Sequence, residues 1–136
     1  GSFIRYDNHN IHSNYIIRNS EIFGLSRTDN TIVSEIAKYH KGNSVPQDED
    51  SFLMLPRSDR MKILKLTAIL RIADALDASH KQKVKSMSAQ LMHSVLTISC
   101  EVTSDMSFEE WSFEHRALIF EEVMGIKPNI KLKRRL

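Results

Sequence analysis

The chain of 136 residues is long enough to bury a hydrophobic core, and its length favours one domain. Its 41% of hydrophobic and 26% of charged residues are typical of a globular protein, and no apolar run approaches the roughly 18 residues that a membrane-spanning helix requires. A net charge of +2 is too small to indicate nucleic-acid binding, and a single cysteine, Cys100, excludes an internal disulfide. No signal peptide is visible, so we expect a cytoplasmic location.

The N-terminal part of the chain predicts two helices. The first spans Asn8–Phe23 and ends at Gly24, because glycine readily takes the left-handed conformation that follows a helix. The second begins at Ser26 or Thr28, whose hydroxyl oxygens can cap free backbone N–H groups, and it ends at Gly42.

A loop and a third helix follow. The loop over Asn43–Arg57 holds two prolines and an acidic cluster, and its length is typical of functional or surface-wrapping loops. The helix Met61–His80 is apolar on most sides, as a buried central helix is. Even so, Arg71, Asp74 and Asp77 line one of its faces. Buried acids are costly unless they are paired or bind a metal, so the helix is predicted to hold an ion pair or a site carboxylate.

The C-terminal part combines strands with a helix. Apolar and polar residues alternate over Val84–Leu91 and Val95–Val102, which indicates a β-hairpin with one solvated face. The stretch Ser107–Met124 is predicted to be a helix that opens with a Ser-x-x-Glu capping box. Its apolar side is expected to comprise Trp111, Leu118, Phe120, Val123 and Met124. A third, edge strand around Ile130–Leu132 would suit the neighbouring lysines.

These elements predict the α+β class. We expect a mainly helical subdomain over residues 1–82. Residues 83–136 are expected to form a small antiparallel β-sheet with a C-terminal helix and a short terminal strand. The two parts are expected to pack into one structural domain.

Histidines and carboxylates from three predicted helices form a candidate metal set. The members are His12, His40 and Asp74, with His9 and Asp77 as second candidates. Histidine with carboxylate suits a transition metal that activates water, and convergence from several helices is how bundle metal sites are built. The simpler alternative is a buried histidine bonded to a carboxylate, with Arg71 in the ion pair of the central helix. Spacing alone favours that alternative.

The last ten residues are strongly basic. Lys127–Leu136 contains five cationic residues and no acid: Lys127, Lys131, Lys133, Arg134 and Arg135. Such a segment can bind a polyanion. A solvated, frayed terminus is the simpler alternative.

Three motifs resemble one family. They are His12-Ser13-x-Tyr15-Ile16-Ile17-x-Asn19-Ser20 with Gly24-Leu25-Ser26, then Ile36-Ala37-x-Tyr39-His40-Lys41, then Leu70-Arg71-Ile72-Ala73-Asp74-Ala75-Leu76-Asp77. Trp111 and Phe120-Glu121-x-Val123-x-Gly125 continue the similarity. In order and spacing these motifs resemble the C-terminal HD-type domain of the exopolyphosphatase / guanosine pentaphosphate phosphohydrolase (Ppx/GppA) family.

The resemblance implies an HD-like helical subdomain in which His12, His40 and Asp74 match positions around a divalent metal: manganese, iron, zinc or magnesium. It also implies that the chain begins just after the paired His-Asp of the family, with Gly1 at the glycine of that motif. We therefore expect a truncated ligand set and no catalytic residue within these 136 residues. The implied partners are the parent's N-terminal actin-like ATPase-type domains, polyphosphate or guanosine pentaphosphate, and a second copy in a homodimer.

Three functions remain open. The first is an accessory domain of an exopolyphosphatase-like phosphoanhydride hydrolase that contributes to the polyphosphate path or to dimerisation, with Lys131, Lys133, Arg134 and Arg135 as polyphosphate ligands. The alternative is a metal-dependent HD phosphohydrolase that acts on a nucleotide phosphoester. The second alternative is an interaction or scaffold module. No membrane and no specific nucleic acid is expected as a partner. If Asp74 belongs to a buried pair, Asp74→Ala should cost on the order of 3 kcal/mol.

Overall fold

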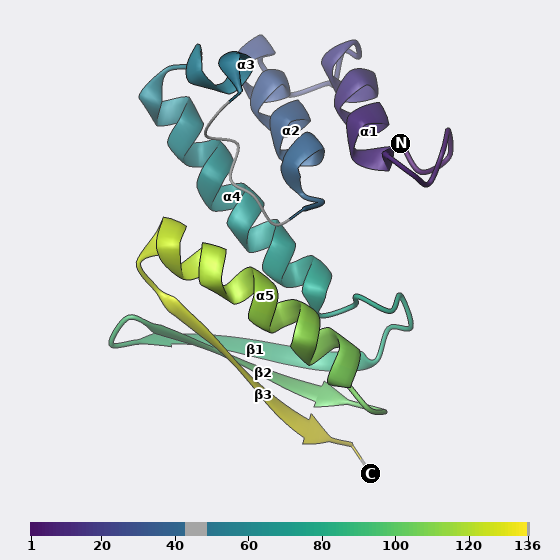
Figure 1. Cartoon of the computed structure of the whole chain (residues 1–136), viewed down its shortest axis with the longest axis vertical. Coiled ribbons are helices and arrows are strands. Elements are labelled where there is room, and N and C mark those ends of the chain that lie inside the picture. The colour runs from purple at the N-terminus through teal and green to yellow at the C-terminus, as the bar shows by residue number, and fades with distance from the viewer. Residues whose placement is uncertain (43–48, 136) are drawn as a thin grey trace. The chain divides into compact units, whose positions relative to one another are not determined.

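The structure of the chain is a computed structural model that describes residues 1–42 and 49–135. In this part of the chain five helices and three strands follow one another (Figure 1), which confirms the predicted α+β class. The chain divides into unit 1, Gly1–Thr67, and unit 2, Ala68–Leu136. The boundary falls inside helix α4 (Arg57–Ala75), whereas the sequence placed it after residue 82, and the division into domains stays a prediction.

Unit 1 begins with α1 (His9–Arg18) and α2 (Arg27–Tyr39). Helix α1 ends before the predicted Phe23, because amide side chains bond the last carbonyls: Asn19 Nδ2 donates to Tyr15 O at 2.8 Å, and Asn30 Nδ2 donates to Ile17 O at 2.9 Å. Helix α2 begins after Ser26, whose hydroxyl oxygen accepts from the backbone N–H of Asp29 at 3.0 Å. The core of this unit comprises Ile32, Tyr39, Phe52 and Ile63.

The predicted loop over Asn43–Arg57 is only partly a loop. Residues 43–48 lie outside those that the structure describes, the short helix α3 (Asp50–Leu53) follows, and α4 already begins at Arg57. Helix α4 ends at Ala75 rather than at His80, because the next backbone N–H groups, from Leu76 to Ala78, donate to carbonyls three residues earlier.

The prediction that the central helix is buried on most sides was wrong. Leu66, Ile69 and Leu70 of α4 are exposed, whereas Ile63, Ala68 and Ile72 are buried. None of the helices in the described part of the chain is long and apolar enough to span a membrane.

Unit 2 contains a three-stranded mixed sheet. Strand β1 (Val84–Met92) pairs antiparallel with β2 (Val95–Val102), as predicted. Strand β3 (Lys127–Arg134) pairs parallel with β2, so the prediction of an antiparallel sheet was wrong for this pair. A parallel neighbour requires a crossover, and α5 (Ser107–Met124) supplies it. The last element is β3, which agrees with the predicted short terminal strand after the helix.

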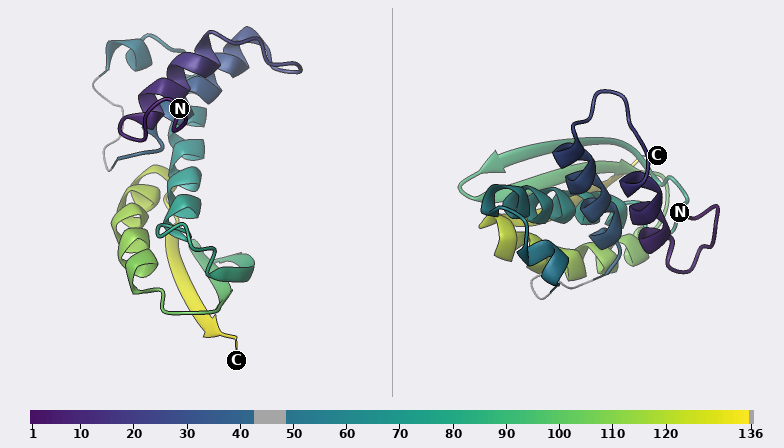
Figure 2. Two further views of the ribbon diagram at one scale, coloured as in Figure 1. Left: turned by 90° about the vertical axis from the view of Figure 1, so that its right-hand side faces the viewer. Right: turned by 90° about the horizontal axis from the view of Figure 1, so that it is seen from above.

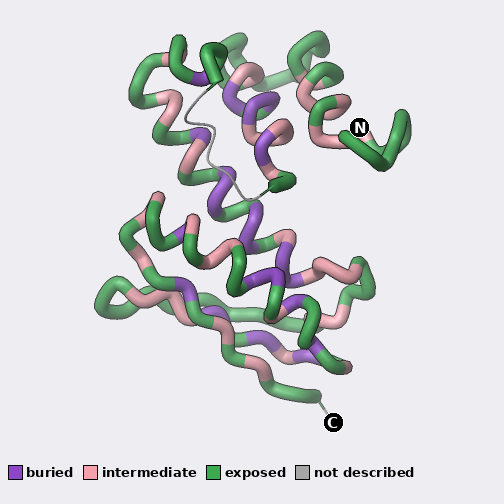
Figure 3. The backbone as a smooth tube through the Cα atoms, viewed as in Figure 1, coloured by how far each residue is buried: buried purple, intermediate pink, exposed green. Residues whose placement is uncertain are grey.

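One face of the sheet is covered and the other is open. Helix α5 lies along one face (Figure 2), where Phe113 and Phe120 pack with Ile98, Cys100 and Val102 of β2. The sequence placed Trp111 and Leu118 on the apolar side of this helix, but their side chains are 56% and 72% exposed. Strand β1 is an edge strand whose residues are exposed along most of its length (Figure 3).

The start of α5 differs from the predicted capping box. Ser107 is the first helical residue rather than the cap, and the N-cap residue Met106 has no side-chain bond. The carboxylate of Asp105 accepts from the backbone N–H of Ser107 at 3.3 Å and from its hydroxyl at 2.8 Å. The predicted stop at Gly125 is confirmed, since this glycine takes the left-handed conformation.

Candidate functional site

Two histidines of unit 1 face each other across α1 and the end of α2. His9 Nε2 lies 3.1 Å from His40 Nε2. The Nδ1 atom of each ring contacts a backbone carbonyl, that of Tyr6 at 3.0 Å from His9 and that of Ala37 at 2.6 Å from His40. A carbonyl oxygen only accepts, so each Nδ1 is assigned as a donor. The two Nε2 atoms then face each other at hydrogen-bond distance, where a proton on one of them or a metal ion between them would relieve the repulsion of their lone pairs.

This geometry fits two of the ligands of a metal ion. Histidine nitrogens bind zinc at about 2.0–2.1 Å, so two of them on one ion lie roughly 3.0–3.4 Å apart. A ligating histidine usually donates its other ring N–H to a carbonyl or carboxylate, as both Nδ1 atoms do here. Among the residues that the structure describes, no group of three or more His, Cys, Asp or Glu side chains could hold a metal. The pair of His9 and His40 would therefore need further ligands.

Each of the other predicted ligands is described within its own unit. His12 is half-buried on α1, one turn beyond His9. Asp74 belongs to unit 2, where its Oδ2 lies 3.5 Å from Arg116 Nη2 and its side chain is 42% exposed. Asp77 Oδ1 accepts a hydrogen bond from the backbone N–H of Gln82 at 2.8 Å. The metal role of His12, His40 and Asp74 stays a prediction.

Arg71 and Asp74 of the central helix lie near a third charged residue, Arg116, which the sequence analysis did not identify. Arg71 is buried, and burial together with the nearby Arg116 cation lowers the pKa of its guanidinium. Arg116 of α5 pairs with Asp74. The estimate of 3 kcal/mol for Asp74→Ala assumed a buried carboxylate, and that condition is not met. No local pattern could identify Arg116, because it lies on a helix far away in the sequence.

The open face of the sheet carries the basic residues of the C-terminal segment. The register sets Lys131 beside Ser99 and Lys133 beside Glu101, with Ser88 and Ser86 one strand further on. A hollow of about 380 Å³ opens there, and its polar lining comprises Ser86, Ser88, Ser99, Glu101, Lys131 and Lys133. Residues 127–135 are not frayed, since residues 127–134 form β3 and the backbone N–H of Arg135 donates to Val102 O at 2.8 Å.

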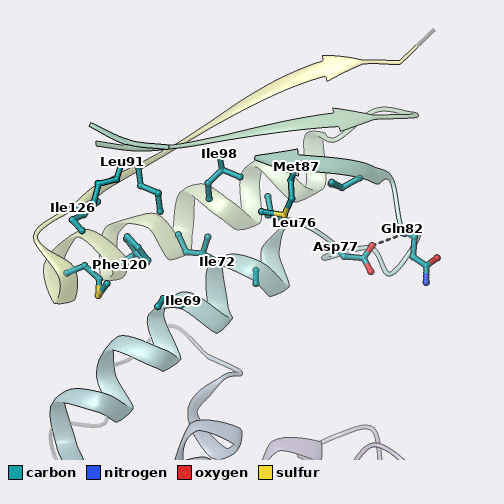
Figure 4. Close-up of a pocket in the computed structure, with 14 residues that line it drawn as sticks. Ile69, Ile72, Leu76, Asp77, Gln82, Met87, Leu91, Ile98, Phe120 and Ile126 are labelled. Carbon is teal, nitrogen blue, oxygen red and sulfur yellow. Dashed lines mark hydrogen bonds between the residues drawn. The ribbon is translucent and has the colours of Figure 1, made fainter. Parts of the chain in front are cut away.

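An apolar groove of about 580 Å³ lies on the covered side of the sheet. Figure 4 shows Ile72 of α4 and Leu76, which follows this helix, facing Met87 of β1 and Ile98 of β2 across the groove. Asp77 lies at one end of the groove, where its carboxylate accepts a hydrogen bond from the backbone N–H of Gln82. This groove could not be predicted from the sequence, because strand alternation does not reveal which apolar side chains stay uncovered. The apolar lining of this groove suits an apolar ligand and not a polyanion.

The elements and the site define an α+β domain with a helical N-terminal unit and a basic edge strand. A family model described as "Ppx/GppA phosphatase, domain III" matches residues 1–123, and the chain belongs to this family. The match confirms the resemblance at the level of the family, and the description as domain III implies an accessory domain of a multidomain parent. No curated protein matches the chain. The HD-type identity and the truncation after a His-Asp pair stay predictions.

Proposed function

We propose that this domain serves an exopolyphosphatase-like parent by holding polyphosphate on the open face of its sheet. The observation that supports this proposal is the register that places Lys131 beside Ser99 and Lys133 beside Glu101, with Ser88 and Ser86 one strand further on, around one hollow. A contribution of the domain to dimerisation stays a prediction.

The chemistry of this face suits a linear polyanion. Lysine ammonium groups bind phosphate as point charges, and hydroxyl groups donate to phosphate oxygens. Arg135 follows the end of β3 and adds a cation close to Lys133, whereas strand alternation turns Arg134 to the other face of the sheet. The guanidinium group of Arg135 can bind phosphate with two parallel bonds. Glu101 is the one acid lining the hollow, so the local charge stays positive. Because the lysines are exposed, binding should weaken steeply as salt rises.

The double substitution Lys131→Ala/Lys133→Ala is expected to weaken binding of long-chain polyphosphate by about tenfold or more at low salt, because it removes two of the phosphate contacts. The matched control is Lys62→Ala/Lys65→Ala, which removes the same charge from exposed positions of α4. Affinity can be measured by titration at several salt concentrations. The slope of log affinity against log salt should be shallower in the first variant only.

Equal losses in the two double variants would mean that net charge and not this face governs binding. In that case the assignment to β3 would be abandoned, even if the chain binds polyphosphate.

A second candidate function is metal-dependent hydrolysis of a nucleotide phosphoester in the parent. The observation that favours it is the pair of Nε2 atoms 3.1 Å apart, each ring fixed by a carbonyl. A divalent metal bound there would supply an activated water. This candidate ranks second because the described residues provide only two facing ligands and no third.

Metal-binding measurements on single variants distinguish the pair of His9 and His40 from the predicted set of His12, His40 and Asp74. If the facing pair binds a metal, His9→Gln should weaken binding of Co²⁺ or Zn²⁺ to the chain by about tenfold or more, whereas His12→Gln should leave it nearly unchanged. Calorimetry or the visible spectrum of bound Co²⁺ provides the readout. A loss in His12→Gln with none in His9→Gln would instead support the ligand set of His12, His40 and Asp74.

A further inference from the structure

One side of strand β1 is open to a further strand. The order of the sheet is β1-β2-β3, so in the described part of the chain β1 pairs with β2 on one side only. Apart from the half-buried Val84, the residues of β1 are exposed. An edge strand presents a row of backbone N–H and C=O groups that can pair with another extended chain.

The two edges of this sheet differ in the features that prevent strand addition. Natural proteins protect edge strands with lysines, other charges and proline. Strand β3, at the opposite edge, carries one proline and four cations: Lys127, Pro128, Lys131, Lys133 and Arg134. In β1 the protection is confined to its start, where Lys85 lies at an irregularity in the register between Val84 and Ser86. Residues 86–92 contain neither a charged residue nor a proline.

The apolar groove of unit 2 lies along this unprotected edge strand (Figure 4). Met87 and Leu91 of β1 line the groove, and they are 56% and 58% exposed. Ile69 lines it from α4 and is 47% exposed. Side chains alternate between the two faces of a strand, so every second side chain of an added strand would lie on the groove side of the sheet. Apolar residues at those positions would cover Met87 and Leu91.

The charge at the start of β1 indicates the chemistry of the added strand. Lys81 and Lys85 are exposed there, whereas Lys83 pairs with the buried Glu109. An acidic residue in the added strand would complement the two exposed lysines. Strand β1 itself contains no acid, so a second copy of the chain paired through β1 would bring no counter-charge to them. The charges therefore favour a different chain as the partner.

We propose that β1 binds an extended peptide segment of another protein by strand addition. The segment has apolar residues at alternate positions on the groove side and an acidic residue near Lys85. Backbone hydrogen bonds to β1 supply affinity, and the groove selects apolar side chains. This inference does not rest on the polyphosphate surface, because that surface is assigned to the lysines of β3 at the other edge of the sheet.

A short synthetic peptide tests the proposal. It has a glutamate at each end, so that either strand direction can be used, and valines that alternate with threonines between them. Fluorescence anisotropy of the labelled peptide should show saturable binding to the chain. The bound peptide should also slow hydrogen exchange at alternate backbone amides of β1 by about tenfold or more, because the N–H groups that point away from β2 acquire partners.

Two matched lysine substitutions locate the binding surface. Leu91→Lys should weaken binding by about tenfold or more, because a charge on the groove side of an edge strand opposes strand addition. Leu118→Lys makes the same change at a 72% exposed position of α5 and should leave the affinity unchanged. Lys85→Ala should weaken binding of the glutamate peptide but not that of a peptide with glutamine at both ends.

Several outcomes would overturn the proposal. They are no saturable binding up to about 1 mM chain, binding that leaves the exchange of β1 unchanged, or equal losses in Leu91→Lys and Leu118→Lys. A wild-type dimer that Leu91→Lys converts to a monomer would make a second copy the occupant instead. Should Leu91→Lys fail to fold, a peptide with lysines in place of the valines provides the same test, and undiminished binding of that peptide would equally contradict the proposal.

Discussion

Replacing Lys83 by methionine is expected to lower the free energy of unfolding by about 3–5 kcal/mol, because it leaves a buried carboxylate without its cation. Glu109 of α5 is 0% exposed, and its Oε2 lies 3.0 Å from Lys83 Nζ. The backbone N–H of Ser79 donates to Glu109 Oε1 at 3.2 Å, and the hydroxyl of Ser79 bonds the same atom. Lys83 Nζ also donates to Asp105 O at 2.8 Å, so the lysine joins the start of β1 to the start of α5.

Lys85→Met is the matched control for this substitution, because Lys85 is an exposed residue of β1. Its cost should stay within about 0.5 kcal/mol. Urea unfolding of the two variants gives the comparison. Equal costs would mean that Glu109 has solvent or another partner available, and the buried pair would not hold the sheet to the helix.

The same pair predicts a dependence on pH. Burial raises the pKa of the Glu109 carboxyl, but hydrogen bonds from Ser79 and Lys83 outweigh it and hold that pKa below its usual value of 4.5. A depressed pKa contributes stability that is present above the unfolded pKa and is lost as pH falls through the folded pKa. The stability of the wild-type chain should therefore fall more steeply below about pH 4.5 than that of Lys83→Met.

Replacing Phe113 by alanine is expected to cost about 3–5 kcal/mol, because it opens a cavity in the core of unit 2. The Phe113 side chain is 2% exposed and packs in the cluster that joins α5 to β2. Phe108 lies on the same helix and is 52% exposed, so Phe108→Ala removes the same atoms with far less burial. Its cost should be about 1 kcal/mol or less.

Chemical unfolding of these two variants decides which face of α5 is buried. Similar costs, or a larger cost for Phe108→Ala, would mean that α5 turns a different face to the sheet. That result would also change which side of the sheet is open to a ligand.

Strands were predicted from sequence because their signal is local. Period-two alternation gave β2 its observed bounds, Val95–Val102, and Gly125 marked the end of α5. Strand direction was not predictable in this way. The alternation of Ile130 and Leu132 with lysines indicates an edge strand, and whether that strand runs parallel to β2 depends on the crossover through α5.

Helix faces were harder to predict because α5 carries apolar residues on more than one side. The sequence analysis grouped Trp111 and Leu118 with Phe120 and left out Phe113, whereas packing on the sheet buries Phe113 and Phe120. The partners within the candidate histidine site were equally hard to predict from the sequence. His9 and His12 share a helix face, so spacing could not choose between them, and the contact between His9 and His40 joins residues 31 apart.

We propose that polyphosphate binds the open face of the sheet. A titration of the isotopically labelled chain with long-chain polyphosphate, followed through its backbone amide chemical shifts, tests it most directly. The largest shifts are expected on residues 99–101 and 131–135, and they should diminish as salt is added. Shifts concentrated around His9 and His40, with the amides of β2 and β3 unchanged, would contradict it.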